Sequence, residues 1–294
     1  MSRGSDSTID PAPTDPQRTI AFQGVAGAYS HLACRQAFPE LFALPCHSFE
    51  DAFAAVREGH ARYAMIAVDN SIAGRVADVH HLLPRGGLHI VGEQFVRVNH
   101  QLLAIHGATL ESIEQVESHV HAIGQCRDFL RRHGYRVRVV ADTAGAAAEI
   151  AAAQDPSRAA IASRLAAEIY GLEILKSDVE DADHNTTRFL VLANEPRYPG
   201  PNDGPVLTTF TFRVRNRPAA LYKALGGFAT NGVNMVKLES YVDGAFTQAE
   251  FYADIMGHPQ HDNVRLAFEE LRFFSHNVDI LGVYPADRFR ERVG

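Results

Sequence analysis

Three neighbouring side chains could hold or act on a ligand: Thr186, Thr187 and Arg188. A hydroxyl can donate or accept a hydrogen bond, and a guanidinium can bind a carboxylate through two parallel hydrogen bonds. The preceding residues 181–185 are polar and turn-prone, whereas Phe189 to Leu192 form an apolar run typical of a buried strand. A polar cluster at the mouth of a buried strand often contacts a ligand. The alternative is an ordinary surface turn.

A glycine-containing loop, Gly24 to His31, follows an apolar strand expected at Thr19 to Phe22 and leads into a helix expected to reach Ala37. Strand, glycine loop and helix N-terminus together form an anion cradle, because the N–H groups of the first helical turn are unpaired. The loop lacks the Gly-Lys-Ser/Thr ending of a nucleotide P-loop and the three-glycine dinucleotide spacing. We therefore expect a carboxylate near Ser30, with a purely structural turn as the alternative.

Polar residues also follow other expected strands. Asn70 and Ser71 come after one buried strand, and Ser118 follows another. Gln125 is expected in the first turn of a helix at 123–133. In a parallel α/β sheet, strand ends of this kind gather at the carboxyl edge, where ligands bind. The alternative for Asn70 and Ser71 is a turn that caps the next helix.

Length and charge limit the class of protein. The chain has 294 residues, which favours about two domains, and its 46% hydrophobic content is that of a globular protein with an ample core. The formal net charge is -7 and the pI is near 6.1. An acidic chain without a dense Lys/Arg block binds nucleic acid or an anionic membrane poorly. A small anion remains a possible ligand, because local groups rather than net charge hold it.

Cysteine and histidine usage gives no metal signature. The three cysteines are far apart, with no CxxC spacing: Cys34, Cys46 and Cys126. Their odd number fits a reducing compartment. His80 and His81 are adjacent and therefore point to different sides of a helix, so we expect no metal there. No apolar run of about 18 residues exists, and the polar N-terminus is no secretory signal, so we expect a soluble cytoplasmic protein.

Strands alternate with helices from residue 19 to 193, which predicts an α/β domain with mostly parallel sheets. Ligand-type residues come from both early and late segments, so two lobes with a cleft between them would bring these residues together. The long strand expected at Leu88 to Val98 can pass from one lobe to the other.

A second, smaller domain is predicted after a proline-rich linker. From Val206 to Tyr284 the pattern is strand, helix, strand, strand, helix, strand, a ferredoxin-like βαββαβ unit whose first helix has Pro218 in its first turn. No nucleophile–base pair or metal cluster appears there, so a binding or regulatory module is the simpler interpretation. We divide the chain into a disordered tail (1–18), the two-lobed domain (19–195), the linker (196–205), the second domain (206–285) and a tail (286–294).

With these motifs placed, the chain resembles monofunctional prephenate dehydratase with a C-terminal ACT regulatory domain. The motifs occur in the family's order: Gly24 to His31, Asn70-Ser71 with Gly74 to Val76, Ser118-His119 with Gln125-Cys126, Asp142 to Gly145, and Asn185 to Phe189. In the second domain, Ala219 to Leu221 and Glu239-Ser240 resemble the two short motifs that bind phenylalanine in the family.

The resemblance implies a reaction and a fold. The family converts prephenate to phenylpyruvate, water and carbon dioxide in phenylalanine biosynthesis, without a metal or organic cofactor, and phenylalanine inhibits it. The implied fold is a two-lobed catalytic domain like a periplasmic solute-binding protein, with the active site in the cleft. The ferredoxin-like ACT domains would pair in a homodimer or homotetramer.

The resemblance also implies residue roles. Thr187 would donate a hydrogen bond to the departing hydroxyl, and Arg188 would bind a carboxylate or instead brace the cleft. The other groups expected to orient the substrate are Asn70, Ser118 and Gln125, and those expected to bind it are Ser30, Ser71, Thr186 and Phe189. The effector site would comprise Ala220, Leu221, Asn234, Glu239 and Ser240.

Two positions depart from the family pattern. Asp69 stands where a glutamate commonly precedes the Asn-Ser pair, and Glu239-Ser240 continues with Tyr241-Val242 instead of Arg-Pro. Because aspartate is shorter than glutamate, it is open how far the Asp69 carboxylate reaches. Because the effector motif is altered, the strength of inhibition by phenylalanine is also open.

Two other functions remain open at this point. Arogenate dehydratase performs the same elimination on the amino acid, and sequence spacing does not separate a keto group from an amino group. A non-catalytic small-acid or amino-acid binding protein would use the same lobes as a trap, although a trap has no use for the Thr187 hydroxyl.

Overall fold

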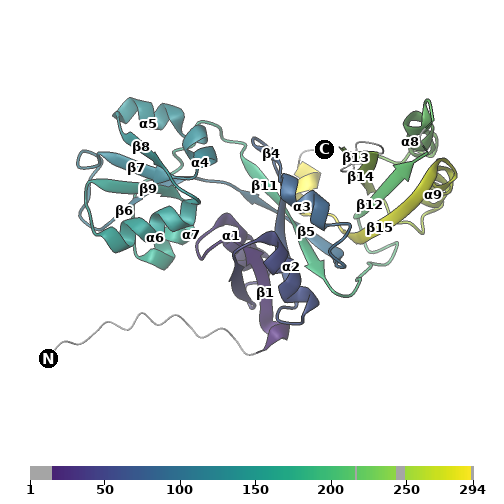
Figure 1. Cartoon of the computed structure of the whole chain (residues 1–294), viewed down its shortest axis with the longest axis horizontal. Coiled ribbons are helices and arrows are strands. Elements are labelled where there is room, and N and C mark those ends of the chain that lie inside the picture. The colour runs from purple at the N-terminus through teal and green to yellow at the C-terminus, as the bar shows by residue number, and fades with distance from the viewer. Residues whose placement is uncertain (1–14, 216, 243–248, 293–294) are drawn as a thin grey trace.

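The computed structural model describes residues 15–215, 217–242 and 249–292, which form three adjoining parts (Figure 1). Lobe 1 comprises residues 19–97 and 186–193, lobe 2 comprises residues 101–176, and the C-terminal domain comprises residues 206–285. Lobe 1 lies between the other two (Figure 1). This confirms the α/β fold with a two-lobed domain and a separate βαββαβ unit.

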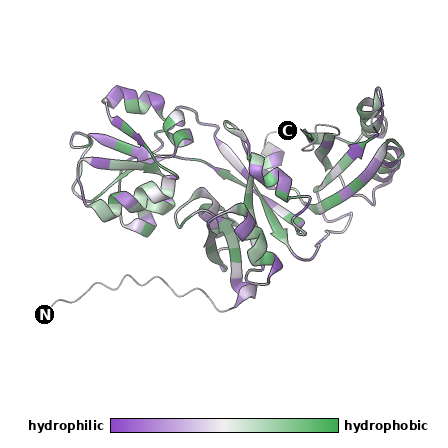
Figure 2. Ribbon diagram, viewed as in Figure 1, coloured by the Kyte–Doolittle hydropathy of each residue, from purple (hydrophilic) through white to green (hydrophobic). Residues whose placement is uncertain are grey.

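Lobe 1 is a mixed sheet with helices on both faces. Its elements are β1 (Thr19–Gln23), α1 (Tyr29–Ala37), β2 (Phe42–Cys46), α2 (Phe49–Arg57), β3 (Tyr63–Asn70), β4 (Gly74–Arg75), α3 (Ala77–Leu82), β5 (His89–Arg97) and β11 (Thr186–Ala193). Strand β1 pairs in parallel with β2 and β3, whereas β11 pairs antiparallel with β3 and β5. Figure 2 shows hydrophobic residues along these central strands.

Lobe 2 repeats this layered arrangement around a five-stranded sheet in the order β10-β6-β9-β7-β8. Its elements are β6 (Gln101–Ala104), β7 (Gln115–Ser118), α4 (Val120–Gln125), α5 (Arg127–His133), β8 (Arg136–Val139), α6 (Thr143–Ala153), β9 (Arg158–Ala162), α7 (Arg164–Tyr170) and β10 (Glu173–Lys176). Phe129 and Leu130 of α5 belong to the core on one face, and Ala147 and Ile150 of α6 to the core on the other.

The C-terminal domain has the predicted βαββαβ order. Its elements are β12 (Val206–Val214), α8 (Ala220–Thr230), β13 (Met235–Val242), β14 (Ala249–Met256), α9 (Asp262–Phe274) and β15 (Ser275–Pro285), followed by a 3₁₀ helix, η2 (Arg288–Arg292). Phe210, Phe228 and Phe268 pack between the sheet and the two helices. The other sheet face supplies Tyr252 and Tyr284 to a core shared with lobe 1.

The C-terminal sheet and the sheet of lobe 1 are continuous. Strand β15 pairs in parallel with β5 at Gly282 and Ile90, which makes one ten-stranded sheet. A Cβ atom on Gly282 would lie 2.2 Å from the Ile90 carbonyl oxygen, so only glycine allows this approach. The linker therefore joins two units that share a sheet, and the C-terminal domain is no free appendage.

Neighbouring residues set several helix ends. Ser48 and Asp51 form a capping box at the start of α2, and Asp142 and Ser163 cap α6 and α7. Gly134 and Gly171 end α5 and α7 in the left-handed conformation. The strand expected at 88–98 ends in lobe 1, and the chain continues directly into β6 of lobe 2.

Other predictions are wrong in detail. The helix expected at 123–133 is two helices separated at Cys126, and Gln125 ends the first of them. Helix α8 begins at Ala220 rather than at Pro218. The sheets are mixed instead of mostly parallel, because β11 in lobe 1 and β6 in lobe 2 each run antiparallel to both of their neighbours, where the chain passes between lobes.

The expected tails are also partly ordered. Residues 16–18 form a short 3₁₀ helix, and Phe289 of η2 stacks on Phe95 of lobe 1 with ring centroids 4.6 Å apart. Residues 1–14 and 293–294 of the expected tails lie outside the described residues. Among the helices that the structure describes, none is long and apolar enough to cross a membrane.

Candidate active site

The candidate site begins at the strand pair β3–β11. Thr187 lies opposite Asn70, and Arg188 lies opposite Asp69. Successive side chains of a strand point to opposite faces. Thr187 therefore shares a face with Phe189, which belongs to the core on the α1 side, while Arg188 shares the other face with Leu190, which belongs to the core on the α2 side.

Asn70 fixes the Thr187 hydroxyl. Its amide nitrogen donates to Thr187 Oγ1 at 2.9 Å and to Asn185 Oδ1 at 2.7 Å. Its amide oxygen accepts the backbone N–H groups of Ile72 and Ala73 at 3.0 and 2.8 Å. The amide nitrogen and the amide oxygen of Asn70 thus both have hydrogen-bond partners, which fixes the orientation of the amide group.

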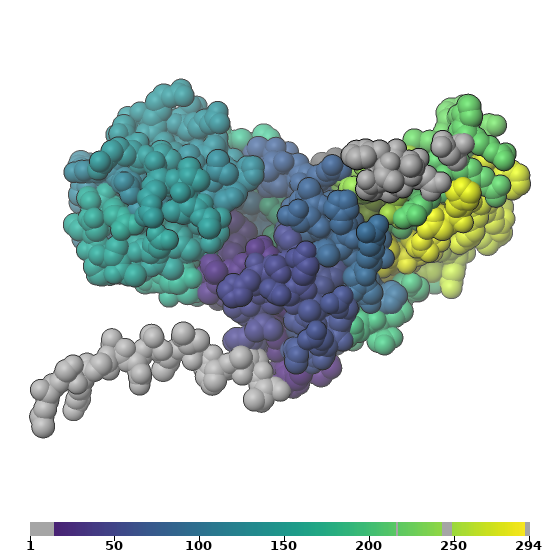
Figure 3. All heavy atoms as spheres, viewed as in Figure 1, coloured from purple at the N-terminus to yellow at the C-terminus, as the bar shows by residue number. Residues whose placement is uncertain are grey.

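The network continues into lobe 2. Asn185 Nδ2 donates to Gln125 Oε1 at 2.8 Å, and His100 Nε2 lies 2.9 Å from the same oxygen. The Tyr29 hydroxyl donates to the Asn99 carbonyl at 2.8 Å and lies 3.0 Å from His100 Nδ1. A chain of side chains thus joins α1 and β3 of lobe 1 to α4 of lobe 2. Figure 3 shows a notch in the surface where the two lobes meet.

Burial keeps the titratable members of this network uncharged. It lowers the pKa of His100, with the hydrogen bond to Gln125 acting in the opposite direction, so the imidazole is neutral at pH 7. Burial also raises the pKa of Tyr29 well above its usual value, and the nearby Glu180 adds to that effect. The network therefore offers neutral hydrogen-bond donors and acceptors.

The Thr187 hydroxyl has a proton available. It accepts from Asn70, and no described residue accepts a hydrogen bond from it. Accepting a hydrogen bond polarises a hydroxyl and makes it a better donor. The Gln125 amide nitrogen also makes no hydrogen bond to any described residue, because both contacts to this side chain involve its oxygen. Both groups can donate to a ligand between the lobes.

The glycine loop seals the junction next to this network. The Ser163 hydroxyl and the Tyr170 hydroxyl of lobe 2 donate to the carbonyls of Gly27 and Ala26 at 2.6 and 2.8 Å. A Cβ atom on Gly27 would lie 2.9 Å from the Cα atom of Ala166. No side chain caps α1, whose first turn contains the half-buried Ser30. Among the described residues, the N–H groups of its first turn therefore have no side-chain partner, as an anion site requires.

Other predicted residues do not face this junction. Ser118 is fully buried, and its hydroxyl donates to the Ile161 carbonyl at 2.6 Å. Phe189 is 1% exposed in the core of lobe 1. Neither side chain reaches the lobe junction in this structure, so their expected contacts with substrate have no support from it. Ser71 and Thr186 form a local clamp, in which Ser71 Oγ accepts the Thr186 N–H and donates to the His184 carbonyl, both at 2.9 Å.

For Arg188 the structure favours a bracing role over the alternative of carboxylate binding. The residue is 5% exposed, and its guanidinium donates to Glu93 at 2.8 Å, to Asp254 at 2.6 Å and to the Tyr284 hydroxyl at 3.0 Å. Burial opposes its charge, but these partners keep its pKa well above the usual value. Because strand alternation directs it to the C-terminal domain, Arg188 braces two domains and does not bind substrate between the lobes.

Three network members were not assigned a role from the sequence: Tyr29, His100 and Asn185. Tyr29 and Asn185 belong to motifs on which the family resemblance rests, and His100 lies where the chain passes from lobe 1 to lobe 2. Their position next to glycine, turn or crossover residues was the available signal, but contacts between distant segments could not be predicted from it.

The predicted effector residues occupy two places in the C-terminal domain. Ala220 and Leu221 begin α8, whereas Asn234, Glu239 and Ser240 lie before or on β13. Within the described residues, no hydrogen bond or ion pair joins the two groups. Leu221 packs against the core of the domain, and Asn234 and Ser240 are exposed. One chain alone therefore does not assemble them into a site.

A pocket of about 730 Å³ separates β13 from lobe 1 and reaches Ser71 and Thr186. Beside it, Asp69, His80 and Glu239 have ligand-type atoms within 4.8 Å of one another, which is the one such group found among the described residues. This group lies on the Arg188 face of the strand pair, away from the Thr187 hydroxyl.

Comparison with known proteins identifies the family. Residues 20–197 match the model of the prephenate dehydratase family. The chain is 50% identical over 277 residues to a bifunctional N-acyl-homoserine lactone acylase/prephenate dehydratase of Komagataeibacter europaeus, covering 94% of this chain and 99% of that protein. It is 38% identical to arogenate dehydratase/prephenate dehydratase 2 of Arabidopsis thaliana, covering 91% and 73%.

A solved structure agrees. Prephenate dehydratase of Arthrobacter aurescens in complex with L-Phe superposes with a TM-score of 0.83 at 29% identity, covering 91% of this chain and 90% of that one. The fold and the family match are those of a dehydratase of the lyase class. The chain belongs to the prephenate dehydratase family, which confirms the resemblance seen in its motifs.

The opposite orientations of Thr187 and Arg188 predict opposite phenotypes. Arg188→Gln leaves Asp254 and part of Glu93 without a buried countercharge, which should lower the free energy of unfolding by about 3–5 kcal/mol. Thr187→Val removes one hydrogen bond while Asn70 keeps its bond to Asn185, so the loss should stay below about 1.5 kcal/mol. Urea denaturation of both variants tests this. Equal midpoints for Arg188→Gln and the unmutated protein would contradict the bracing role.

Proposed function

We propose that this protein is a prephenate dehydratase, which converts prephenate to phenylpyruvate, water and carbon dioxide in L-phenylalanine biosynthesis. The observation that carries the proposal is the Thr187 hydroxyl, held by Asn70 with its proton free at the junction of the two lobes. The family assignment and the network through Asn185 to Gln125 support it.

The chemistry suits these groups. Prephenate is a dianion with a ring hydroxyl, and its aromatisation on loss of carbon dioxide and hydroxide supplies the driving force. An alcohol is a weak acid, so Thr187 stabilises the departing hydroxide by a hydrogen bond that strengthens as charge develops. The uncapped N-terminus of α1 near Ser30 binds one carboxylate. Gln125 donates to a polar group of the substrate, and the reaction needs no added cofactor.

Turnover of prephenate is the direct test. Purified protein should form phenylpyruvate, measured by its absorbance in alkali. Thr187→Val should lower kcat by about 10²- to 10³-fold, because one hydrogen bond to the leaving group is lost. Thr230→Val, at the exposed end of α8, serves as the matched control. Unchanged kcat in Thr187→Val would exclude the proposed donor.

The same assay decides between the substrates. We propose a higher kcat/KM for prephenate than for arogenate, although plant relatives carry arogenate dehydratase in their names. A higher value for arogenate would reverse the substrate assignment and keep the enzyme class. Turnover of neither, with binding of either, would favour the non-catalytic binding protein.

The name of the Komagataeibacter relative favours a second candidate function, hydrolysis of the amide bond of N-acyl-homoserine lactones. The described residues offer no Ser, Thr or Cys side chain hydrogen-bonded to a histidine ring, so an activated nucleophile of that kind is not present among them. If the protein has this activity, it should release homoserine lactone from N-octanoyl-homoserine lactone faster than a blank without protein. No release would remove it.

We also propose that phenylalanine inhibits the enzyme by binding to paired C-terminal domains in a homodimer or homotetramer. These domains then act as ACT modules, and α8 of one chain completes the site at β13 of another. Three observations support this. One chain leaves the effector residues apart, strand β13 is a sheet edge with exposed Leu238 and Val242, and a relative was solved with L-Phe. Such coupling is typically about 1–3 kcal/mol.

An exposed side chain offers a clean test of the effector site. Asn234→Ala should raise the phenylalanine concentration for half-inhibition by about 3- to 10-fold, the effect of one lost hydrogen bond. Asn263→Ala, exposed on α9 of the same domain, is the control. Light scattering with and without phenylalanine gives the oligomeric state. Phenylalanine that leaves turnover of the unmutated protein unchanged would contradict the proposal. Deleting the domain is a poor test, because Asp254 and Tyr284 hold Arg188.

A further inference from the structure

The strand pair that carries Thr187 and Asn70 has a second polar face. On that face Asp69 lies beside Arg188, with Asp69 Oδ2 3.6 Å from Arg188 Nη1. Asp69 and Asn70 are consecutive residues at the end of β3. Any group that fixes Asp69 therefore also limits where the Asn70 amide can lie.

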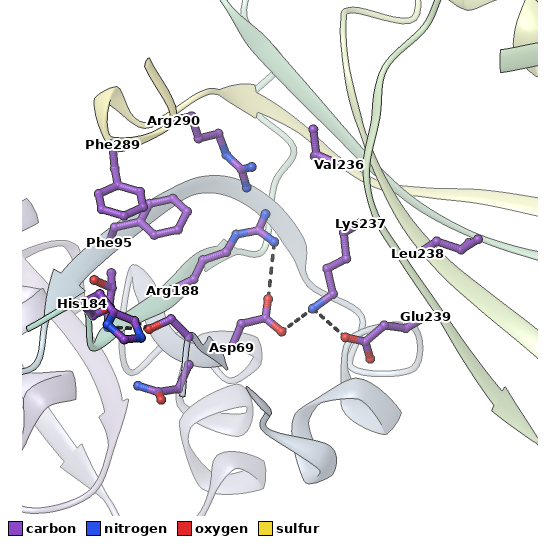
Figure 4. Close-up of a pocket in the computed structure, with 13 residues that line it drawn as sticks. Asp69, Phe95, His184, Arg188, Val236, Lys237, Leu238, Glu239, Phe289 and Arg290 are labelled. Atoms are coloured by element: carbon purple, nitrogen blue, oxygen red, sulfur yellow. Dashed lines mark hydrogen bonds and ion pairs between the residues drawn. The ribbon is translucent and has the colours of Figure 1, made fainter. Parts of the chain in front are cut away.

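The C-terminal domain supplies such a group. The ammonium of Lys237 on β13 bonds to the Asp69 carboxylate and, at 3.0 Å, to Glu239 Oε1 (Figure 4). The Lys237 side chain is 12% exposed, and its nitrogen lies 5.6 Å from the centroid of the Tyr252 ring. The two carboxylates and the Tyr252 ring together hold the Lys237 side chain, which is largely buried, in one position. An exposed ion pair rarely fixes a lysine in this way.

A bound metal ion is a weaker explanation of this cluster. The group Asp69, His80 and Glu239 has ligand-type spacing, and the buried His80 ring has no hydrogen-bond partner among the described residues. However, the Lys237 ammonium bonds to both carboxylates and balances charge where an ion would lie. Burial and Lys237 both lower the pKa of His80, so the ring adds no charge. The two carboxylates therefore already have cationic partners in Lys237, Arg188 and Arg75.

We propose that Lys237 is a positioning residue of the dehydratase: through Asp69 it fixes the end of β3, and with it the Asn70 amide that orients the Thr187 hydroxyl. The inference rests on the proposed function. A misplacement of about 1 Å can cost about 10²-fold in rate, so a fixed strand end matters for turnover without any contact between Lys237 and substrate.

The Glu239 side of the cluster is fixed by hydrogen bonds as well. The Tyr241 hydroxyl donates to Glu239 Oε2 at 2.6 Å, and the Tyr241 ring stacks on His80. The Tyr241 and Lys237 hydrogen bonds outweigh burial and lower the pKa of Glu239 to about 2. Glu239 thus stays ionised and helps to hold Lys237.

A double-mutant cycle on kcat tests whether Lys237 acts through Asp69. The variants are Lys237→Met, Asp69→Asn and the double variant, and the exposed Lys223→Met of α8 is the control. Lys237→Met should lower kcat by about 10- to 100-fold with KM changed by less than about 3-fold. The double variant should be no slower than the slower single variant, because both remove the same constraint.

Two further measurements separate positioning from general destabilisation. Lys237→Arg keeps a cation and should therefore recover most of the kcat that Lys237→Met loses, with KM unchanged. If Lys237 only stabilised the fold, Lys237→Arg would not show this recovery of kcat at unchanged KM. Thermal unfolding of each variant identifies any variant that fails to fold. If Lys237→Met fails because the Asp69 charge is left without Lys237, the double variant, which lacks that charge, should still fold and can be assayed.

Multiplicative losses in the double variant, or a Lys237→Met kcat within about 2-fold of the control, would overturn the inference. Turnover by the unmutated protein tests the proposed function separately, and the cycle uses whichever of prephenate and arogenate it converts. Unmutated protein that converts neither would overturn both proposals.

Discussion

A buried guanidinium is the interaction on which the arrangement of the domains depends. Arg188 lies in the sheet of lobe 1, but Asp254 and Tyr284, two of its three hydrogen-bond partners, belong to the C-terminal domain. Removing one partner from a buried ion pair costs about 3–5 kcal/mol, so these contacts fix the C-terminal domain against lobe 1. The continuous sheet at Gly282 and Ile90 has the same consequence, because it covers the edge of β5.

Features with a local cause could be predicted from the sequence. The Ser48 capping box, the left-handed glycines at 134 and 171, and the βαββαβ order each follow from a few neighbouring residues. The antiparallel strands at the lobe crossings could not be predicted, because their pairing depends on segments about 90 residues apart, as for Arg188 and Phe95. The break at Cys126 comes two residues after Gly124, a weak helix former that the expectation of one continuous helix did not take into account.

The candidate site shows the same division. Thr187, Asn70 and Gln125 were recognised as polar residues near strand ends and within family motifs, and the structure brings them into one network. For Arg188 the sequence left carboxylate binding and bracing open, and the two-residue period of a strand places it on the face opposite Thr187. Lys237 could not be found, since it reaches Asp69 across 168 residues of sequence.

Two faces of one strand pair therefore carry two tasks. One face presents Thr187 and Asn70 to the lobe junction, and the other presents Arg188 and Asp69 to the C-terminal domain. Side chains on the two faces alternate along the same rigid backbone. A movement of the strand that displaces Asp69 or Arg188 therefore also displaces Asn70 or Thr187, and no pathway of side chains is needed between them. Glu239 belongs both to the predicted effector motif and to the Lys237 cluster. A ligand that repositions Glu239 would therefore act on the same strand end that holds the Thr187 hydroxyl.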